Sequence, residues 1–97
     1  MKIVFSKKGD IRFISHLDLM RLFQRAARRA GLPVAMTRGF SPRMKISITK
    51  ALKLGLESDG EEAVFHMDKA AGPKNFIDLM NQNLPEGIRI IRAEESG

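Results

Sequence analysis

The stretch 15–33 constrains the fold more than any other part of the chain, because it specifies one amphipathic helix with both ends marked. Ser15 is a residue type favoured at helix N-caps, and Asp18 three positions later completes the acidic variant of a capping box. The helix is therefore predicted to start at His16 or Leu17. Its polar face is basic, since it carries four arginines and one acid.

The same helix has a defined end and two distinct faces. Gly31 can adopt the left-handed C-terminal conformation, Leu32 supplies the accompanying apolar contact, and Pro33 prevents continuation. At ~100° per residue, one arc of roughly 160° is apolar and faces a core. It holds Leu19, Met20, Leu22, Phe23, Ala26, Ala27 and Ala30. The opposite arc of roughly 100° holds Arg21, Arg25, Arg28 and Arg29, with Asp18 beside them.

Short strand patterns surround this helix. A turn at Lys8-Gly9-Asp10 separates the first two strands, and the segment 54–62 is predicted to be a turn region around Gly60. A second helix begins at Pro73, buries Phe76, Ile77 and Met80, and ends at 85–87. The predicted strands span 2–7, 11–14, 32–37, 46–49, 62–68 and 88–93.

The order of these elements predicts an α+β domain. Strand, helix, strand, strand, helix, strand is the split βαβ pattern of ferredoxin-like folds, with additions at the first strand and in the middle. Right-handed crossovers place both helices on one face of an antiparallel sheet. The other face stays free and is lined by polar residues including Ser47, Thr49 and His66. Residues 1–97 are expected to form a single domain.

Charge is distributed unevenly along the chain. Residues 1–53 hold 13 Lys and Arg against 2 acids, a net charge of +11, whereas residues 54–97 hold 4 against 9, a net charge of −5. Clustered basic side chains release condensed counterions when they neutralise phosphates, so the asymmetry favours a polyanionic partner. The alternative is a basic protein with no partner for its charge.

The sequence lacks the catalytic motifs that most enzyme classes require. Cys is absent, and no phosphate-binding glycine loop, zinc-protease motif or nucleophile elbow occurs. No cofactor or metal is expected, and no signal peptide or membrane span is present, which makes a cytoplasmic location the default. His16, at a helix start, is a weak candidate for a general base or else an exposed residue. His66 is expected to face solvent.

The arginine-rich face of the helix has two interpretations. A small protein needs a polar outer face, and arginine is a good helix former. However, Arg21 with Arg25, and Arg25 with Arg29, are like-charged pairs at i,i+4 that cost a few tenths of a kcal/mol each. Arginine also suits bidentate phosphate recognition. We therefore favour Arg21, Arg25, Arg28 and Arg29 as an anion-binding face over simple solvent cover.

The segment 38–45, "RGFSPRMK", is a second candidate contact. Arg38, Arg43 and Lys45 flank Phe40, an aromatic residue that could stack on a base, while Gly39 allows backbone amides to approach a phosphate. Alternatively, Phe40 anchors the loop on the core. Together the helix and this loop predict an RNA-binding domain, with transfer RNA as the expected ligand class.

Several ordered motifs carry a family resemblance. Through "SHLDLMR", "RRAGLPVA" and "GFSPRMKIS", and more loosely through "ALKLGLES" and "LPEGIRI", the chain resembles the N-terminal part of the radical-SAM-linked protein family, a domain of unknown function (2344). The matching motif positions are Ser15, His16, Leu17, Asp18, Arg21, Arg28, Gly31, Gly39, Phe40, Pro42 and Lys45.

The resemblance implies an accessory module for RNA-linked or translation-linked chemistry, since family members are encoded beside or fused to cobalamin-binding radical SAM proteins. It implies a radical SAM enzyme as a second candidate partner, to which this domain would dock or present a substrate. A third hypothesis is that the chain is itself a small RNA-processing enzyme that uses His16 as general base. This chain has no CxxxCxxC motif and cannot itself hold that enzyme's iron–sulfur cluster. It also lacks a histidine that the family commonly carries near Arg43 and Met44. Because the family module is usually longer, the chain is expected to be its N-terminal portion.

Overall fold

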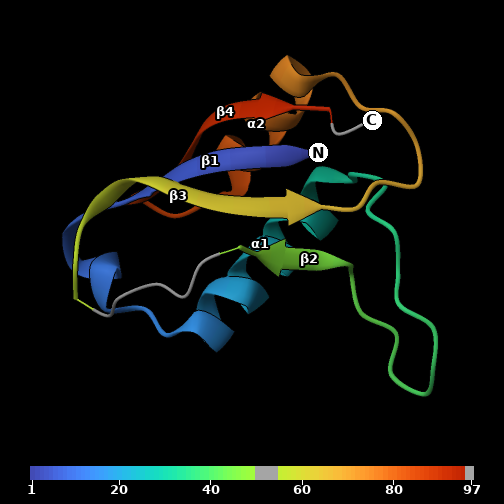
Figure 1. The fold of residues 1–97 in the computed structure, drawn as a ribbon, viewed down its shortest axis with the longest axis horizontal. Helices are drawn as coiled ribbons and strands as arrows, with labels where there is room; N and C mark the ends of the chain where they lie inside the picture. The colour runs from blue at the N-terminus through green and yellow to red at the C-terminus, as the bar shows by residue number, and fades with distance from the viewer. Residues whose placement is uncertain (50–54, 96–97) are drawn as a thin grey trace.

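The sheet and its two covering helices reproduce the predicted split βαβ arrangement. The computed structural model describes residues 1–49 and 55–95. Its elements are β1 (Lys2–Lys7), η1 (Gly9–Phe13), α1 (His16–Ala30), β2 (Ile46–Ile48), β3 (Ser58–Phe65), α2 (Pro73–Asn83) and β4 (Ile88–Glu94). The described strands pair antiparallel in the order β2-β3-β1-β4, and both helices lie on one face (Figure 1). The fold is α+β with ferredoxin-like topology, and its other sheet face is uncovered.

Helix α1 has the ends that its sequence predicts. The Ser15 hydroxyl accepts a hydrogen bond from Asp18 N at 3.1 Å, and Gly31 has a φ of 68°. Leu32 N donates to Ala27 O at 3.1 Å, which closes the last turn. A capping box also requires the Asp18 side chain to accept a hydrogen bond from the Ser15 backbone N–H. That part of the prediction is wrong, because the Asp18 carboxylate accepts from Arg21 Nη1 at 3.4 Å instead. The guanidinium is a charged donor, and it takes the carboxylate toward the exposed face of the helix.

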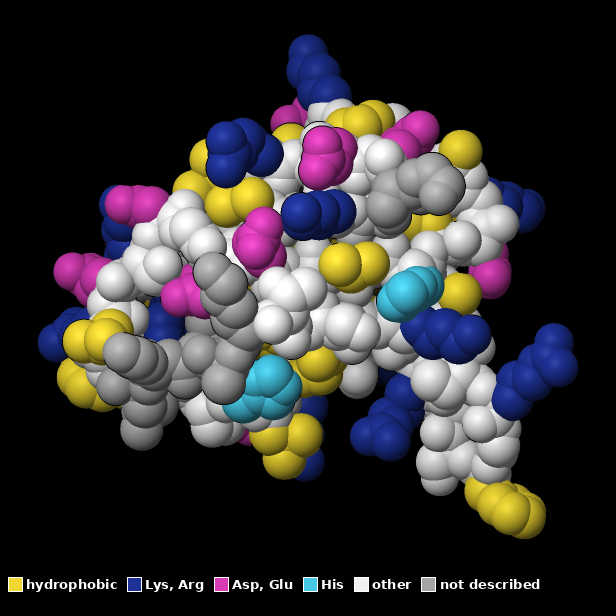
Figure 2. All heavy atoms as spheres, in the orientation of Figure 1, with side chains coloured by type: hydrophobic (Ala, Val, Ile, Leu, Met, Phe, Trp, Pro, Cys, Tyr) yellow, Lys and Arg dark blue, Asp and Glu magenta, His cyan; other side chains and the backbone are white. Residues whose placement is uncertain are grey.

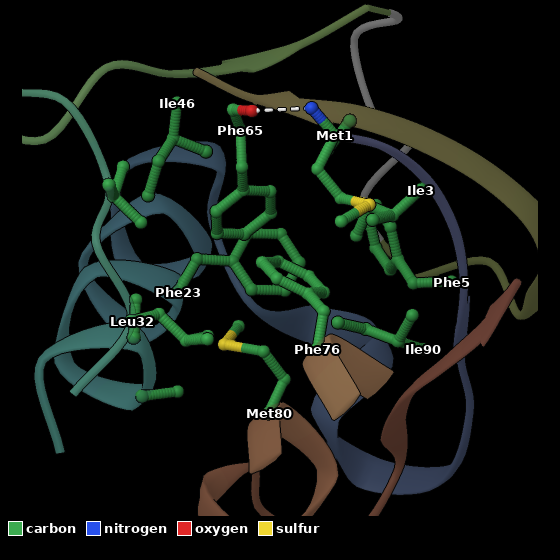
Figure 3. Packing of buried hydrophobic residues seen from close by; sticks show 14 of the residues in the cluster. Met1, Ile3, Phe5, Phe23, Leu32, Ile46, Phe65, Phe76, Met80 and Ile90 are labelled. Atoms are coloured by element: carbon green, nitrogen blue, oxygen red, sulfur yellow. Dashed lines mark hydrogen bonds between the residues drawn. The ribbon is translucent and has the colours of Figure 1, made fainter. Parts of the chain in front are cut away.

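Four phenylalanines join both helices to the sheet. Phe23 of α1 lies between Phe5 of β1 and Phe65 of β3, with ring centroids 5.1 and 5.6 Å away, and Phe65 meets Phe76 of α2 at 5.1 Å (Figure 3). All three contacts are edge-to-face, and all four rings are fully buried. Edge-to-face pairs contribute ~0.5–1.5 kcal/mol beyond their buried area. This aromatic row is the centre of the core.

Strand β4 lies at one edge of the sheet, and α2 satisfies part of its backbone. The Asn81 side-chain amide donates to Ile90 O at 3.0 Å and its oxygen accepts from Ile90 N at 2.8 Å. This is the pair of hydrogen bonds that a neighbouring strand would make. Asn81 therefore fixes α2 against β4 while completing the hydrogen bonding of one edge residue.

The second predicted strand, 11–14, is wrong: this part of the chain forms the 3₁₀ helix η1. Ile11 and Ile14 are three residues apart, so one turn of 3₁₀ helix places both on the core side, where both are partly buried. The predicted positive φ of Gly9 is confirmed, at 70°, but Gly9 and Asp10 form the start of η1 rather than a turn between two strands. Gly87 allows η1 to pack closely, since a Cβ there would lie 2.5 Å from Ile11 Cγ2.

Two further boundaries differ from prediction. The segment 32–37 forms isolated bridges, Val34 with Met67 and Met36 with Met44, because it changes partner at Ala35, whose N–H donates to His66 O while its carbonyl accepts from Lys45 N. The predicted turn region 54–62 is confirmed at Gly55 and wrong from Ser58, where β3 already begins; Leu54 lies outside the described residues. Pairing with β1 overrides the low strand propensity of this acidic segment. Strand β3 ends at Phe65 rather than at residue 68.

Phe23→Ala should lower the free energy of unfolding by ~3–5 kcal/mol, because it opens a cavity where the two helices meet the sheet. Phe23→Leu should cost less while keeping the domain folded. Urea denaturation followed by circular dichroism measures both. Phe40→Ala is the matched control: it removes the same side chain from an exposed position and should change stability by less than ~0.5 kcal/mol. Equal losses at the two positions would contradict the role of the aromatic row.

Asn81→Ala should destabilise the domain by ~1–3 kcal/mol, because it removes two hydrogen bonds and leaves partly buried backbone groups of Ile90 without partners. The amide of Ile90 should also exchange faster with solvent. Gln82→Ala, an amide truncation at the adjacent exposed position, is the control. An unchanged exchange rate at Ile90 would show that the hydrogen bonds between Asn81 and Ile90 are not formed in solution.

Candidate nucleic-acid interface

A hairpin-like loop, residues 36–45, extends from the sheet beyond β2 (Figure 1). Thr37 N donates to Arg43 O at 2.6 Å, and Arg43 N donates to the Thr37 hydroxyl at 2.9 Å. Met36 and Met44 form the bridge below them. We call residues 36–45 the basic hairpin. Its neck is closed by one backbone–backbone hydrogen bond and by one bond from a backbone amide to the Thr37 hydroxyl, and these hold the loop above it.

The basic hairpin presents an aromatic ring among cations. Phe40 is fully exposed, at 107% of its reference area, and Arg38, Arg43 and Lys45 are exposed as well. The alternative that Phe40 anchors the loop on the core is therefore wrong. The loop is held by its own backbone bonds and needs no apolar anchor. Figure 2 shows basic side chains along this loop.

The four arginines of α1 lie on its outer surface. All are exposed, and they are opposite the buried Leu19 and Phe23, so they face away from the sheet. We call Arg21, Arg25, Arg28 and Arg29 the arginine arc. Arg21 pairs with Asp18 at 3.4 Å, whereas the other three make no ion pair within residues 1–49 and 55–95. The arc therefore carries uncompensated positive charge, as its sequence predicts.

The structure brings the predicted site residues together as two groups. Arg25 and Arg29 line a groove of about 510 Å³ between α1 and the end of α2. Arg43 and Lys45 line a hollow of about 340 Å³ on the other flank of α1, beside Gln24. Helix α1 therefore separates the two basic groups, and Arg21 and Arg28 lie on its surface between these flanks.

The two histidines have different surroundings. His66 lines the same hollow as Arg43, Lys45 and Ser47. The strand pattern predicted only that His66 faces solvent; its position opposite the basic hairpin depends on contacts between segments far apart in the chain. His16 is exposed at the start of α1 and lines none of the hollows described here. Its role as a general base stays a prediction.

The sheet region differs from the basic hairpin in its charge balance. Lys2 pairs with Glu62 at 3.6 Å, and Lys8 pairs with Asp59 at 2.7 Å. The Asp59 carboxylate raises the pKa of Lys8 above its ordinary value, through a hydrogen bond and through its charge. Figure 2, which views the uncovered sheet face, shows acidic and basic side chains intermixed there. Among the described residues, three arginines of α1 and the three cations of the basic hairpin form no ion pair, and neither do Arg89 and Arg92 of β4.

Other kinds of site are not seen in the described part of the chain. Residues 1–49 and 55–95 contain no group of three or more His, Cys, Asp or Glu side chains arranged to hold a metal ion. Among the helices described, none has the length and apolarity to cross a membrane.

These features define an α+β domain of ferredoxin-like topology that carries a basic hairpin and an arginine-faced helix. A family model described as "Uncharacterized protein conserved in bacteria (DUF2344)" matches residues 1–97, and the chain belongs to this family. No curated protein matches the chain, and neither does any solved structure. The family description names neither a reaction nor a partner.

Thr37→Val should loosen the basic hairpin, because it removes the acceptor of the Arg43 amide at nearly constant volume. Amide exchange should speed up at Arg43, while global stability changes by less than ~1 kcal/mol, since water can replace this exposed bond. Thr49→Val is the control; it removes a hydroxyl that bonds Glu62 O at the far end of β2. Faster exchange at Arg43 in both variants would indicate a general rather than a local effect.

Proposed function

We propose that this domain binds RNA through the basic hairpin and the arginine arc, with transfer RNA as the expected ligand class. The observation that carries the proposal is the fully exposed Phe40 between Arg38 and Arg43 on a loop with a closed neck. An exposed aromatic ring beside cations is the arrangement with which proteins stack and hold unpaired bases. The ring contacts no core residue that would explain its presence there.

The arginine arc supports the same proposal. Arg25, Arg28 and Arg29 have no acidic partner in the described residues, so their repulsion is relieved only by solvent or by a bound anion. A phosphate backbone supplies such anions at regular intervals. Because the arc runs from the flank of α1 near the basic hairpin to the flank near α2, an RNA crossing α1 would contact both groups.

A second candidate function is docking to a protein, with a radical SAM enzyme as the proposed partner. The observation that favours it is apolar exposure around the "SHLD" segment: Phe13 is 56% and Leu17 is 55% exposed. Capture of that enzyme from cell extract after nuclease treatment and at high salt would support docking. Loss of the enzyme under either condition would favour an RNA-mediated association.

Charge reversal in the arc tests the RNA proposal. Arg25→Glu with Arg28→Glu should weaken binding to total transfer RNA by at least about tenfold. The slope of log K against log salt concentration should also fall by the amount that about two phosphate contacts contribute. Electrophoretic mobility shift or fluorescence anisotropy at two salt concentrations measures both. The matched control is Lys69→Glu with Lys74→Glu, which changes the net charge equally at exposed positions outside the arc. Salt-insensitive binding, or equal losses in the two double variants, would contradict the proposal.

Removing the exposed ring tests the role of the basic hairpin. Phe40→Ala should weaken binding to single-stranded RNA by about 5- to 150-fold, corresponding to the ~1–3 kcal/mol of one stacked base. Its effect on a fully paired duplex should be smaller, because duplex bases are already stacked. Fluorescence anisotropy with the two RNAs gives the comparison. Equal effects on strand and duplex would show that Phe40 does not stack on bases.

A further inference from the structure

The hollow between α1 and the neck of the basic hairpin has a chemically distinctive lining. Its volume is about 340 Å³, at the lower end of the ~300–1,000 Å³ typical of small-molecule sites. Three segments that are separate in the sequence contribute to it: α1, the basic hairpin together with β2 that directly follows it, and the residue after β3. Its polar lining consists of Gln24, Thr37, Arg43, Lys45, Ser47 and His66.

Backbone hydrogen bonds hold two of these residues side by side. His66 N donates to Lys45 O at 3.0 Å, Lys45 N donates to Ala35 O at 2.7 Å, and Ala35 N donates to His66 O at 2.7 Å. The three bonds form a closed set that joins the residue after β3 to Lys45, at one end of the basic hairpin, and to Ala35, just before its other end. The side chains of Lys45 and His66 therefore start from fixed neighbouring positions, which lowers the entropy lost when they bind a ligand.

The charge of this lining is positive and has no counter-charge. Arg43 and Lys45 form no ion pair among the described residues, and no carboxylate lines the hollow. The hollow along β4 differs, since it includes Glu62 and Glu94, whereas the groove lined by Arg25 and Arg29 likewise has no carboxylate. The hydroxyl of Ser47 and the amide of Gln24 add neutral donors. Thr37 accepts from Arg43 N, and its hydroxyl proton can still be donated.

We propose that this hollow is a phosphate-binding site. Arg43 and Lys45 supply charge-assisted hydrogen bonds, and Ser47 and His66 supply further donors to the remaining phosphate oxygens. The assignment rests on the proposed function, which it makes more specific: in the RNA complex the hollow holds one phosphate of the strand whose base stacks on Phe40. On its other side, His66 borders a hollow that contains Asp68, Lys69 and Glu95.

The test is a titration followed by nuclear magnetic resonance, with inorganic phosphate and adenosine 5′-monophosphate as probes. Both should shift the His66 ring signals and the amides of Lys45 and Ser47 saturably, whereas adenosine alone and sodium chloride at equal ionic strength should not. Arg43→Ala with Lys45→Ala should weaken the phosphate response by more than about tenfold. Arg38→Ala is the control, since Arg38 is a basic residue of the same hairpin that does not line the hollow.

The outcomes separate this inference from the proposed function. Phosphate shifts that match those of sodium chloride, or that persist undiminished in the Arg43→Ala, Lys45→Ala variant, would overturn the phosphate site even if RNA binds. Saturable, Arg43-dependent phosphate binding without any RNA binding would uphold the site and remove the RNA proposal. Loss of the response in Arg38→Ala to the same degree would show that general hairpin charge, not the hollow, is responsible.

Discussion

The edge-to-face contacts of Phe23 are the interaction on which the rest of the domain depends. This one ring meets β1 through Phe5 and β3 through Phe65, whose other side meets Phe76 of α2. The position of α1 relative to the sheet is therefore set from its buried face. Because a helix is rigid, the same contact orients its outer face, so the direction in which the arginine arc points follows from the packing of the core.

Among the described residues, three arginines of α1 and the cations of the basic hairpin form no ion pair, and Arg89 and Arg92 of β4 form none either. Lys2 and Lys8 each have an acidic partner, whereas Arg25 and Arg28 do not. The uneven charge of the two halves of the chain therefore appears as an uneven distribution of charge over the folded domain. Strand β3 brings Glu61 and Glu62, acids of the second half, opposite Phe5 and Val4 of β1.

Local signals predicted α1 well, because Ser15, the apolar stripe and Gly31 each act within one or two turns. The overall topology followed from the order of the elements. The segment 11–14 was mispredicted as a strand from its apolar residues alone; the spacing of Ile11 and Ile14, which a strand would place on opposite faces and a 3₁₀ turn places on one side, was the local signal against it. The grouping of His66 with Lys45 could not be predicted, since it arises from pairing between segments about twenty residues apart whose register no local pattern encodes.

The two hydrogen bonds between Asn81 and Ile90 have a consequence beyond stability. An edge strand with free backbone groups is a template on which another chain can add a strand, and such additions begin aggregation. The amide of Asn81 occupies the hydrogen-bonding groups of Ile90, so a foreign strand would have to displace an intramolecular partner before it could pair with the middle of β4. A single side chain on a covering helix thereby limits self-association through this edge when many copies of the chain are close together.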